Sequence, residues 1–140
     1  MKASAKTRAL YQIGEVADRA DLSLRTVRYY EETALVSPCD RTEGGFRLYG
    51  ENEIQRLLVI KQMKPLGFTL EEMRELLAAR DELEVVAPDT AAHARLLERV
   101  AKFAAQAKKK TDKLRRHVNA GEQLVSELQG ELRRQRKRAA

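Results

Sequence analysis

The sequence predicts a mainly α-helical fold, in which a winged helix-turn-helix domain with a small two-stranded β wing precedes a long coiled-coil helix. Three observations support this fold class. Two short amphipathic segments lie on either side of a brief polar break within residues 13–32. A Gly-Gly pair then separates two short alternating runs, which indicates a tight hairpin. Finally, one apolar stripe repeats over residues 97–132 with heptad spacing and no proline, which is typical of a coiled coil.

Length and composition limit the classes of protein to which this chain can belong. A chain of 140 residues holds one modest domain with an extension. No apolar run approaches the roughly 18 residues of a membrane span, and residues 1–10 lack the apolar core of a signal peptide. The single cysteine, Cys39, excludes an internal disulfide and a thiolate-rich zinc or iron–sulfur site. We therefore expect a cytoplasmic protein that holds no metal.

The net charge of +6 is concentrated near the C-terminus. Residues 1–80 carry 13 Lys and Arg against 12 Asp and Glu, or +1, whereas residues 108–140 carry 11 against 4, or +7. Basic clusters of this kind can approach phosphate or another anionic surface. A solvated helix face with a basic tail explains them equally well, so net charge alone does not indicate a DNA-binding protein.

The first two segments differ in pattern. Residues 1–10 are small and polar with several basic side chains, and they predict a flexible basic N-terminal arm. In the following segment apolar residues recur at spacings of three and four, which predicts a short helix. These residues are Ile13, Val16, Ala17 and Ala20.

A second short helix is predicted to begin after Ser23, whose hydroxyl can accept a hydrogen bond from a free amide of the first turn. Leu24, Val27 and Tyr30 share its inner face. The side chains left to point outward are Arg25, Thr26, Arg28 and Tyr29. Two short helices joined by a brief turn form a helix-turn-helix, and a recognition helix presents such groups to DNA. An ordinary helix hairpin with a charged outer face is the alternative.

The hairpin at residues 41–49 favours the helix-turn-helix. Its two glycines can both adopt positive φ and so form the turn. On the returning strand, alternation places Phe46 and Leu48 on one face and Arg47 and Tyr49 on the other. A wing beside a helix-turn-helix can contact the phosphate backbone, and the candidate side chains are Arg41, Arg47 and Tyr49. The alternative, a plain surface hairpin, agrees less well with this position in the chain.

Two further helices complete the predicted domain, which spans residues 11–80. The first covers about residues 52–64 and stops at Pro65. The second opens with Thr69 and Glu72, which form a capping box because each side chain can satisfy the other residue's free amide. We expect these helices to support the helix-turn-helix and to carry no chemistry. An acidic linker is predicted at residues 81–88.

A long dimerisation helix is predicted over residues 89–138. Its apolar seam, with alternating spacings of three and four, consists of Leu97, Val100, Ala104, Ala107, Thr111, Leu114, Val118, Gly121, Val125, Leu128 and Leu132. Such a helix is roughly 70 Å long, so one small domain cannot cover its seam. The seam needs a partner helix, and a second copy of the chain is the simplest one. The alternative is a helix that folds back on its own domain.

Several motifs in the predicted domain resemble those of MerR-family transcription regulators. They are Tyr11-Gln12-Ile13-Gly14-Glu15-Val16-Ala17, the segment 24–32 with Leu35-Val36, the wing from Arg41 through Gly44-Gly45-Phe46-Arg47-Leu48-Tyr49, and Leu66-Gly67-Phe68-Thr69-Leu70-Glu71-Glu72. They occur in the order that the family shows, and together they cover residues 11–80.

The resemblance implies a mode of action. It implies a dimer on a pseudo-palindromic operator, often inside a promoter with an overlong spacer, that bends and untwists the DNA so that RNA polymerase can use it. By position, it assigns the recognition helix Arg25, Thr26, Arg28 and Tyr29, and the wing Arg47 and Tyr49. It also implies that the long helices pair as an antiparallel coiled coil.

The chain departs from the sensor subgroups of the family. Metal-sensing members place cysteines at the start of the dimerisation helix and in a C-terminal loop, and redox-sensing members carry a cysteine cluster; the matching regions here hold no cysteine. Cys39, just before the wing, is interpreted as a bystander. His93 and His117 are 24 residues apart on one helix and cannot share a metal within a chain. We therefore expect no metal or redox sensor and no cofactor.

These patterns predict a sequence-specific DNA-binding transcription regulator that acts as a homodimer, and no enzyme. The sequence has no nucleophile–base pairing, phosphate-cradling loop or metal-ligand cluster. The expected partners are double-stranded DNA and a second copy of the chain, and the resemblance adds RNA polymerase. We expect no association with a membrane. The expected location is the cytoplasm, on the nucleoid. Two alternatives are an architectural protein that bends DNA by reading its shape and charge and a coiled-coil protein-interaction module.

Overall fold

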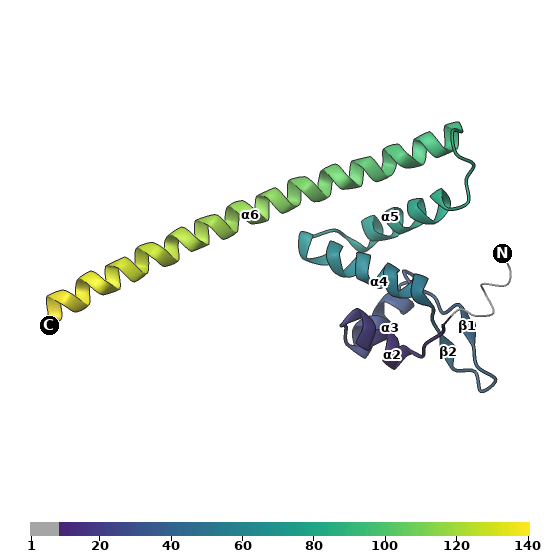
Figure 1. Cartoon of the computed structure of the whole chain (residues 1–140), viewed down its shortest axis with the longest axis horizontal. Coiled ribbons are helices and arrows are strands. Elements are labelled where there is room, and N and C mark those ends of the chain that lie inside the picture. The colour runs from purple at the N-terminus through teal and green to yellow at the C-terminus, as the bar shows by residue number, and fades with distance from the viewer. Residues whose placement is uncertain (1–8) are drawn as a thin grey trace. The chain divides into compact units, whose positions relative to one another are not determined.

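The computed structural model describes residues 9–140 as a series of helices with one small hairpin (Figure 1). The predicted basic arm covers residues 1–10, and residues 1–8 of it lie outside the described part of the chain. Contacts divide the chain into two compact units, Met1–Val100 and Ala101–Ala140. The predicted fold class, mainly α with a two-stranded wing and a long C-terminal helix, is confirmed.

Two short helices, α2 (Ile13–Ala20) and α3 (Leu24–Glu32), form the helix-turn-helix. Asp21 ends α2 in the left-handed conformation, with φ 54°, and Ser23 begins α3 because its Oγ accepts a hydrogen bond from the backbone N of Thr26 at 3.1 Å. Val27 is buried as expected. Leu24 differs from the expectation, because it is 42% exposed although it lies on the predicted inner face.

The wing consists of β1 (Asp40–Arg41) and β2 (Arg47–Leu48), which pair antiparallel with Asp40 opposite Leu48. The loop of this hairpin includes more residues than the two glycines that were expected to form the turn. The backbone N of Thr42 donates to the carbonyl of Phe46 at 2.8 Å, and only one of the glycines, Gly45, has a positive φ, of 86°. The predicted hairpin is thus present, with a wider loop closed partly by the Thr42 side chain, which accepts from the Phe46 backbone N at 3.0 Å.

The supporting pair consists of α4 (Glu51–Met63), a short 3-10 turn η1 (Lys64–Leu66) and α5 (Leu70–Leu83). The capping box of α5 is confirmed: the Thr69 backbone N donates to Glu72 Oε1 at 2.9 Å, and the Glu72 backbone N donates to Thr69 Oγ1 at 3.1 Å. The predicted linker began too early, because α5 continues to Leu83. Asp81 and Glu82 are compatible with a helix, and no proline lies between Leu70 and Pro88.

Cations from α4 and α5 complete the ends of the helix-turn-helix. Lys61 Nζ donates to the carbonyls of Ala20 and Asp21 at 3.1 and 3.0 Å, and Arg74 Nη1 donates to the carbonyl of Thr33 at 2.9 Å. The last carbonyls of a helix have no partner within it and carry the negative end of its dipole. These side chains therefore fix α2 and α3 against the supporting pair.

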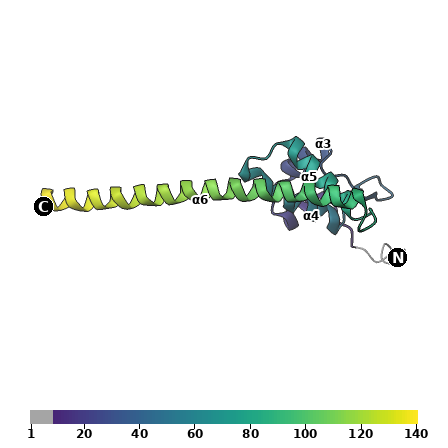
Figure 2. The same cartoon turned by 90° about the horizontal axis from the view of Figure 1, so that it is seen from above.

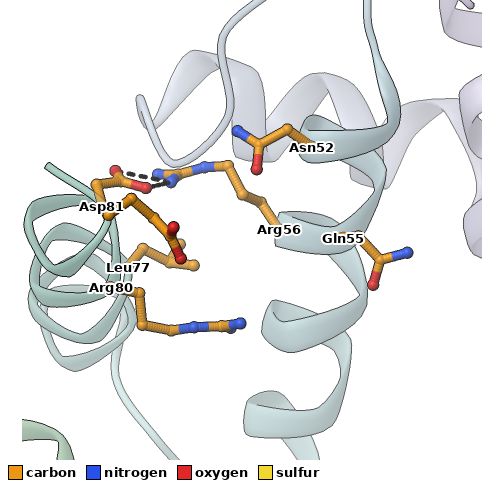
Figure 3. A pocket seen from close by; sticks show the side chains of 7 residues that line it. Asn52, Gln55, Arg56, Leu77, Arg80 and Asp81 are labelled. Atoms are coloured by element: carbon orange, nitrogen blue, oxygen red, sulfur yellow. Dashed lines mark hydrogen bonds and ion pairs between the residues drawn. The ribbon is translucent and has the colours of Figure 1, made fainter. Parts of the chain in front are cut away.

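Arg56 joins three segments of the first unit. Its Nε and Nη2 donate to the carbonyl of Leu35 at 3.2 and 3.0 Å, and its Nη1 lies 2.7 and 2.8 Å from the two carboxylate oxygens of Asp81 on α5. Figure 3 shows this pair at one end of a small polar pocket between α4 and α5. Arg56 thereby ties the segment after α3 to both supporting helices.

The last element, α6 (Ala91–Ala139), is one helix of 49 residues, and its ribbon is unbroken along its whole length (Figure 2). It starts two residues later than the predicted boundary at 89, because Thr90 caps it: Thr90 Oγ1 accepts from the backbone N of His93 at 3.1 Å. At 1.5 Å per residue it is about 74 Å long. No helix in the described part of the chain is both long and apolar enough to cross a membrane.

Candidate nucleic-acid interface

The outer face of α3 carries the predicted recognition residues. Arg25, Arg28 and Tyr29 are exposed, and Tyr29 presents 45% of its surface. Thr26 is half-buried, and its hydroxyl lies 2.8 Å from the Ser23 hydroxyl. The helix therefore offers two guanidinium groups and a phenol to a ligand, whereas Thr26 also stabilises the first turn. That these side chains contact DNA stays a prediction.

The wing presents basic and aromatic side chains together. Arg41 is exposed and its Nη1 donates to the carbonyl of Gly45 at 3.0 Å. Arg47 has a half-exposed side chain, with Nη1 at 3.4 Å from Glu31 Oε1. Phe46 is 64% exposed. Guanidinium groups on an exposed hairpin suit the contact with a phosphate backbone that the sequence predicts for Arg41 and Arg47.

Tyr49 is a correction to the predicted interface. It was expected to lie along the phosphate backbone with Arg47, but it is 0% exposed and its hydroxyl donates to Glu31 Oε2 at 2.7 Å. Tyr49 and Arg47 do share a face of the hairpin, since Glu31 contacts both. At the base of the wing that face turns toward α3, not toward solvent, so Tyr49 packs in the core and is not available to DNA.

The Tyr49 phenol remains protonated over the whole ordinary pH range. Burial raises the pKa of Tyr49 well above its usual value, and the hydrogen bond to Glu31 raises the pKa further. The residue therefore acts as a hydrogen-bond donor to the carboxylate. Its backbone is held as well, because Tyr11 and Tyr49 exchange two backbone hydrogen bonds of 2.7 and 2.8 Å.

A surface hollow brings the recognition helix and the wing together. Its volume is about 180 Å³, and the residues that line it are Gln12, Ile13, Arg28, Phe46 and Arg47. The structure thus places one guanidinium from α3 and one from the wing at the same depression. Arg25 and Arg41, the other two predicted arginines, lie outside this lining.

Glu31 is the residue of this region that the sequence analysis missed. Neither Glu31 nor Glu32 is among the predicted DNA-binding residues. The available signal was the spacing, because residues three apart lie on the same helix face, which places Glu31 beside Arg28. Its partners in the wing are separated from it by 16 and 18 residues, and no local pattern indicates them.

The seam of α6 is a second candidate surface. Its large apolar side chains are between 43% and 59% exposed in the single chain, and they are Leu97, Leu114, Val118, Val125, Leu128 and Leu132. Leu124, one position before Val125, is 54% exposed and widens the apolar stripe beyond the predicted seam. An exposed apolar stripe of this kind is typical of a surface that binds another protein, and its pairing with a second helix stays a prediction.

The charged side chains of α6 interact mainly along the helix. Lys108 Nζ and Arg115 Nη1 lie 3.1 and 3.2 Å from the carboxylate of Asp112, and the hydrogen bond from Lys108 lowers the pKa of that carboxyl. Exposed pairs of this type contribute little to stability. Within residues 9–140, no group of three or more His, Cys, Asp or Glu side chains is arranged to hold a metal ion.

Two family models match the chain. The model described as MerR HTH family regulatory protein matches residues 11–80, and the model described as MerR, DNA binding matches residues 54–138. The first match covers the helix-turn-helix, the wing and most of the supporting pair, and the second reaches through most of α6.

Individual relatives agree with these models. The HTH-type transcriptional regulator ZntR of Escherichia coli K12 is 48% identical over 75 residues, which cover 54% of this chain and 53% of ZntR. The transcription regulator PbrR691 from Ralstonia metallidurans CH34, solved in complex with lead(II), is 37% identical, with a TM-score of 0.52 over 75% of this chain and 77% of that one. A MerR-family transcriptional regulator from Bacillus thuringiensis has the same fold, with a TM-score of 0.64 at 22% identity, over 89% of this chain and 97% of that one.

The matched region is partial in the curated relatives. The chain spans about half the length of ZntR.

Proposed function

The chain belongs to the MerR family of helix-turn-helix regulatory proteins, and from that premise we propose that it is a sequence-specific transcription regulator that binds double-stranded DNA. The observation that carries the proposal is the hollow shared by Arg28 of the recognition helix and Arg47 of the wing. A helix that reads base edges and a wing that grips phosphate are the two kinds of contact that sequence-specific binding needs.

The proposed contacts divide by type. Arg25, Arg28 and Tyr29 on α3 face the major groove, where Arg can pair with guanine edges. Arg41 and Arg47 contact the phosphate backbone, and Thr26, in the first turn of α3, offers its hydroxyl to the same backbone. Tyr49 does not belong to this set because it is buried.

We also propose that the working form is a homodimer. The half-exposed seam of α6 supports this, because apolar side chains along a helix of 49 residues gain stability when a second helix covers them. The seam is Leu97, Val100, Ala104, Ala107, Thr111, Leu114, Val118, Val125, Leu128 and Leu132. The family resemblance gives the antiparallel orientation, and a two-fold dimer requires a pseudo-palindromic operator.

The proposed mode of action follows the family. The dimer bends and untwists promoter DNA so that RNA polymerase can use it, and the protein acts on the nucleoid without enzymatic activity. The proposal includes no metal or redox sensor, since the cysteines of those subgroups have no counterpart in this sequence. An architectural DNA-bending protein is the main alternative, and it differs in lacking a strong base preference.

In vitro selection tests the proposal directly. The full chain, free of added metal, is used to enrich duplexes from a random pool, and the enriched sequences are then footprinted. We expect a two-fold sequence with a nuclease-hypersensitive centre, which indicates distortion. Arg28→Ala should abolish the enrichment while leaving the dimer intact, whereas Arg99→Ala, at an exposed position on α6, serves as the matched loss of charge and should enrich the same sequence.

Three outcomes would contradict the proposal. Binding without any enriched sequence would favour the architectural alternative. A stable dimer without DNA binding would favour a coiled-coil interaction module. Enrichment of the same sequence by the Arg28→Ala variant would remove the recognition role from α3.

A further inference from the structure

Glu31 connects the recognition helix to the wing. It is the last residue but one of α3, and its side chain is 13% exposed. Oε2 accepts the hydroxyl of Tyr49 at 2.7 Å, and Oε1 lies 3.4 Å from Arg47 Nη1. A carboxylate near the C-terminus of a helix is disfavoured by the helix dipole. The two groups that stabilise the carboxylate against the dipole are the Arg47 guanidinium, on the second strand of the wing, and the Tyr49 hydroxyl, just after that strand.

Tyr49 fixes the inner side of this carboxylate. The ring is fully buried, the backbone pairs with Tyr11 through hydrogen bonds of 2.7 and 2.8 Å, and the hydroxyl is a short donor to Oε2. Because Tyr49 is held at both backbone and ring, the carboxylate of Glu31 has little freedom to rotate. Its second oxygen is therefore directed at Arg47.

Glu31 holds the guanidinium of Arg47 at the hollow that Arg28 also lines. Arg28 precedes Glu31 by three residues and so lies on the same side of α3, and the two arginines line one hollow. The Arg47 side chain is 50% exposed, so the outer part of its guanidinium remains accessible to a phosphate while Glu31 contacts Nη1. The carboxylate thus positions one DNA-binding charge relative to another.

We infer that Glu31 is a positioning residue for DNA recognition. It holds Arg47 beside Arg28, which raises discrimination between DNA sequences, and its negative charge lowers affinity for DNA of any sequence. The two effects have opposite signs and can be measured separately. This inference rests on the proposed sequence-specific DNA binding.

The test compares the full chain and its variants on two duplexes. One duplex carries the sequence obtained by selection, and the other is a scrambled duplex of the same length and composition. Glu31→Gln retains an oxygen that can accept the Tyr49 hydrogen bond but has no charge for Arg47. We expect it to bind the scrambled duplex several-fold more tightly and the selected duplex no more tightly, so that the ratio of affinities falls about fivefold, the magnitude of one partly exposed ion pair.

Glu32→Gln is the matched control. Glu32 is the exposed neighbour on α3, and its loss removes the same charge without touching the wing. It should tighten binding to both duplexes alike and leave the ratio unchanged. In an Arg47→Ala background, Glu31→Gln should lower the ratio no further, because the two residues act through one interaction. If Glu31→Gln changes the ratio no more than Glu32→Gln does, the inference is overturned.

Tyr49→Phe provides a second, charge-neutral test. It removes the hydroxyl that fixes Oε2, alters no charge and touches no group that faces DNA, and it stands in for Glu31→Gln if that variant does not fold. We expect a fall in the ratio with unchanged salt dependence; an unchanged ratio overturns the inference. Equal affinity of the unmodified chain for both duplexes contradicts sequence-specific binding itself, whereas a normal ratio that survives Glu31→Gln contradicts only the role of Glu31.

Discussion

Replacing Arg56 with alanine tests how α4 supports the helix-turn-helix. The side chain is 20% exposed and makes two kinds of contact. Two of its nitrogens donate to the carbonyl of Leu35, which follows α3, and a third pairs with the carboxylate of Asp81 on α5. Alanine removes both and leaves the Leu35 carbonyl without this charged donor.

The expected loss of stability follows from the two contacts. A hydrogen bond from a charged donor to a part-buried carbonyl contributes about 1.5–3 kcal/mol. The pair with Asp81, whose side chain is 58% exposed, contributes less than about 1 kcal/mol after solvent screening. We therefore expect Arg56→Ala to lower the free energy of unfolding of the first unit by about 2–3 kcal/mol, which corresponds to roughly 10–20 °C in Tm for a domain of this size.

Tyrosine fluorescence isolates the unit in question. The chain has four tyrosines and no tryptophan, and all four tyrosines lie within residues 11–49. Urea unfolding followed by tyrosine fluorescence therefore reports on the helix-turn-helix region, whereas circular dichroism at 222 nm includes the long α6. Asp81→Asn is the matched variant, because it weakens the ion pair but keeps the bonds to Leu35.

The difference between the two variants shows how much the hydrogen bonds to the Leu35 carbonyl contribute to stability. Asp81→Asn should lower the free energy of unfolding by less than about 1 kcal/mol, and Arg56→Ala should lower it clearly more. Equal losses in the two variants would refute the reasoning, because the hydrogen bonds to the Leu35 carbonyl would then contribute nothing to stability.

Three further predictions concern the interface, the seam and pH. Arg47→Ala should weaken binding to every duplex and reduce the slope of log affinity against log salt by about 1, while Arg25→Ala should change the selected sequence; unchanged slope or sequence contradicts the assignment. In a homodimer, Leu128→Asp places one charge from each copy in the seam. It should raise the dimer dissociation constant, measured by sedimentation, by roughly a thousandfold, which corresponds to about 2 kcal/mol for each copy. Ser126→Asp, which lies off the seam, should leave the sedimentation behaviour unchanged. Burial and the Glu31 hydrogen bond raise the pKa of Tyr49. The protonated phenol therefore stabilises the fold fully below about pH 10, and this contribution is lost as the pH rises above that value. The urea midpoint of unfolding should fall more steeply with rising pH in the unmodified chain than in the Tyr49→Phe variant, and parallel curves would contradict this.

Local patterns in the sequence were sufficient for most of the fold. The capping residues Ser23 and Thr69 act within three residues of themselves, and the periods of apolar residues gave the helices and the unbroken α6. These features depend on neighbours along the chain, and so the residue order alone determines them. The outward face of α3 with Arg28 followed in the same way.

Contacts between distant residues decided the rest. The hydroxyl of Tyr49 reaches Glu31 across 18 residues, Arg56 reaches Leu35 across 21 and Arg74 reaches Thr33 across 41. Alternation along β2 correctly placed Tyr49 on the same face as Arg47, but it could not show that this face turns toward α3. Whether a face is buried depends on what packs against it, and only the tertiary structure brings Glu31, Arg47 and Tyr49 together.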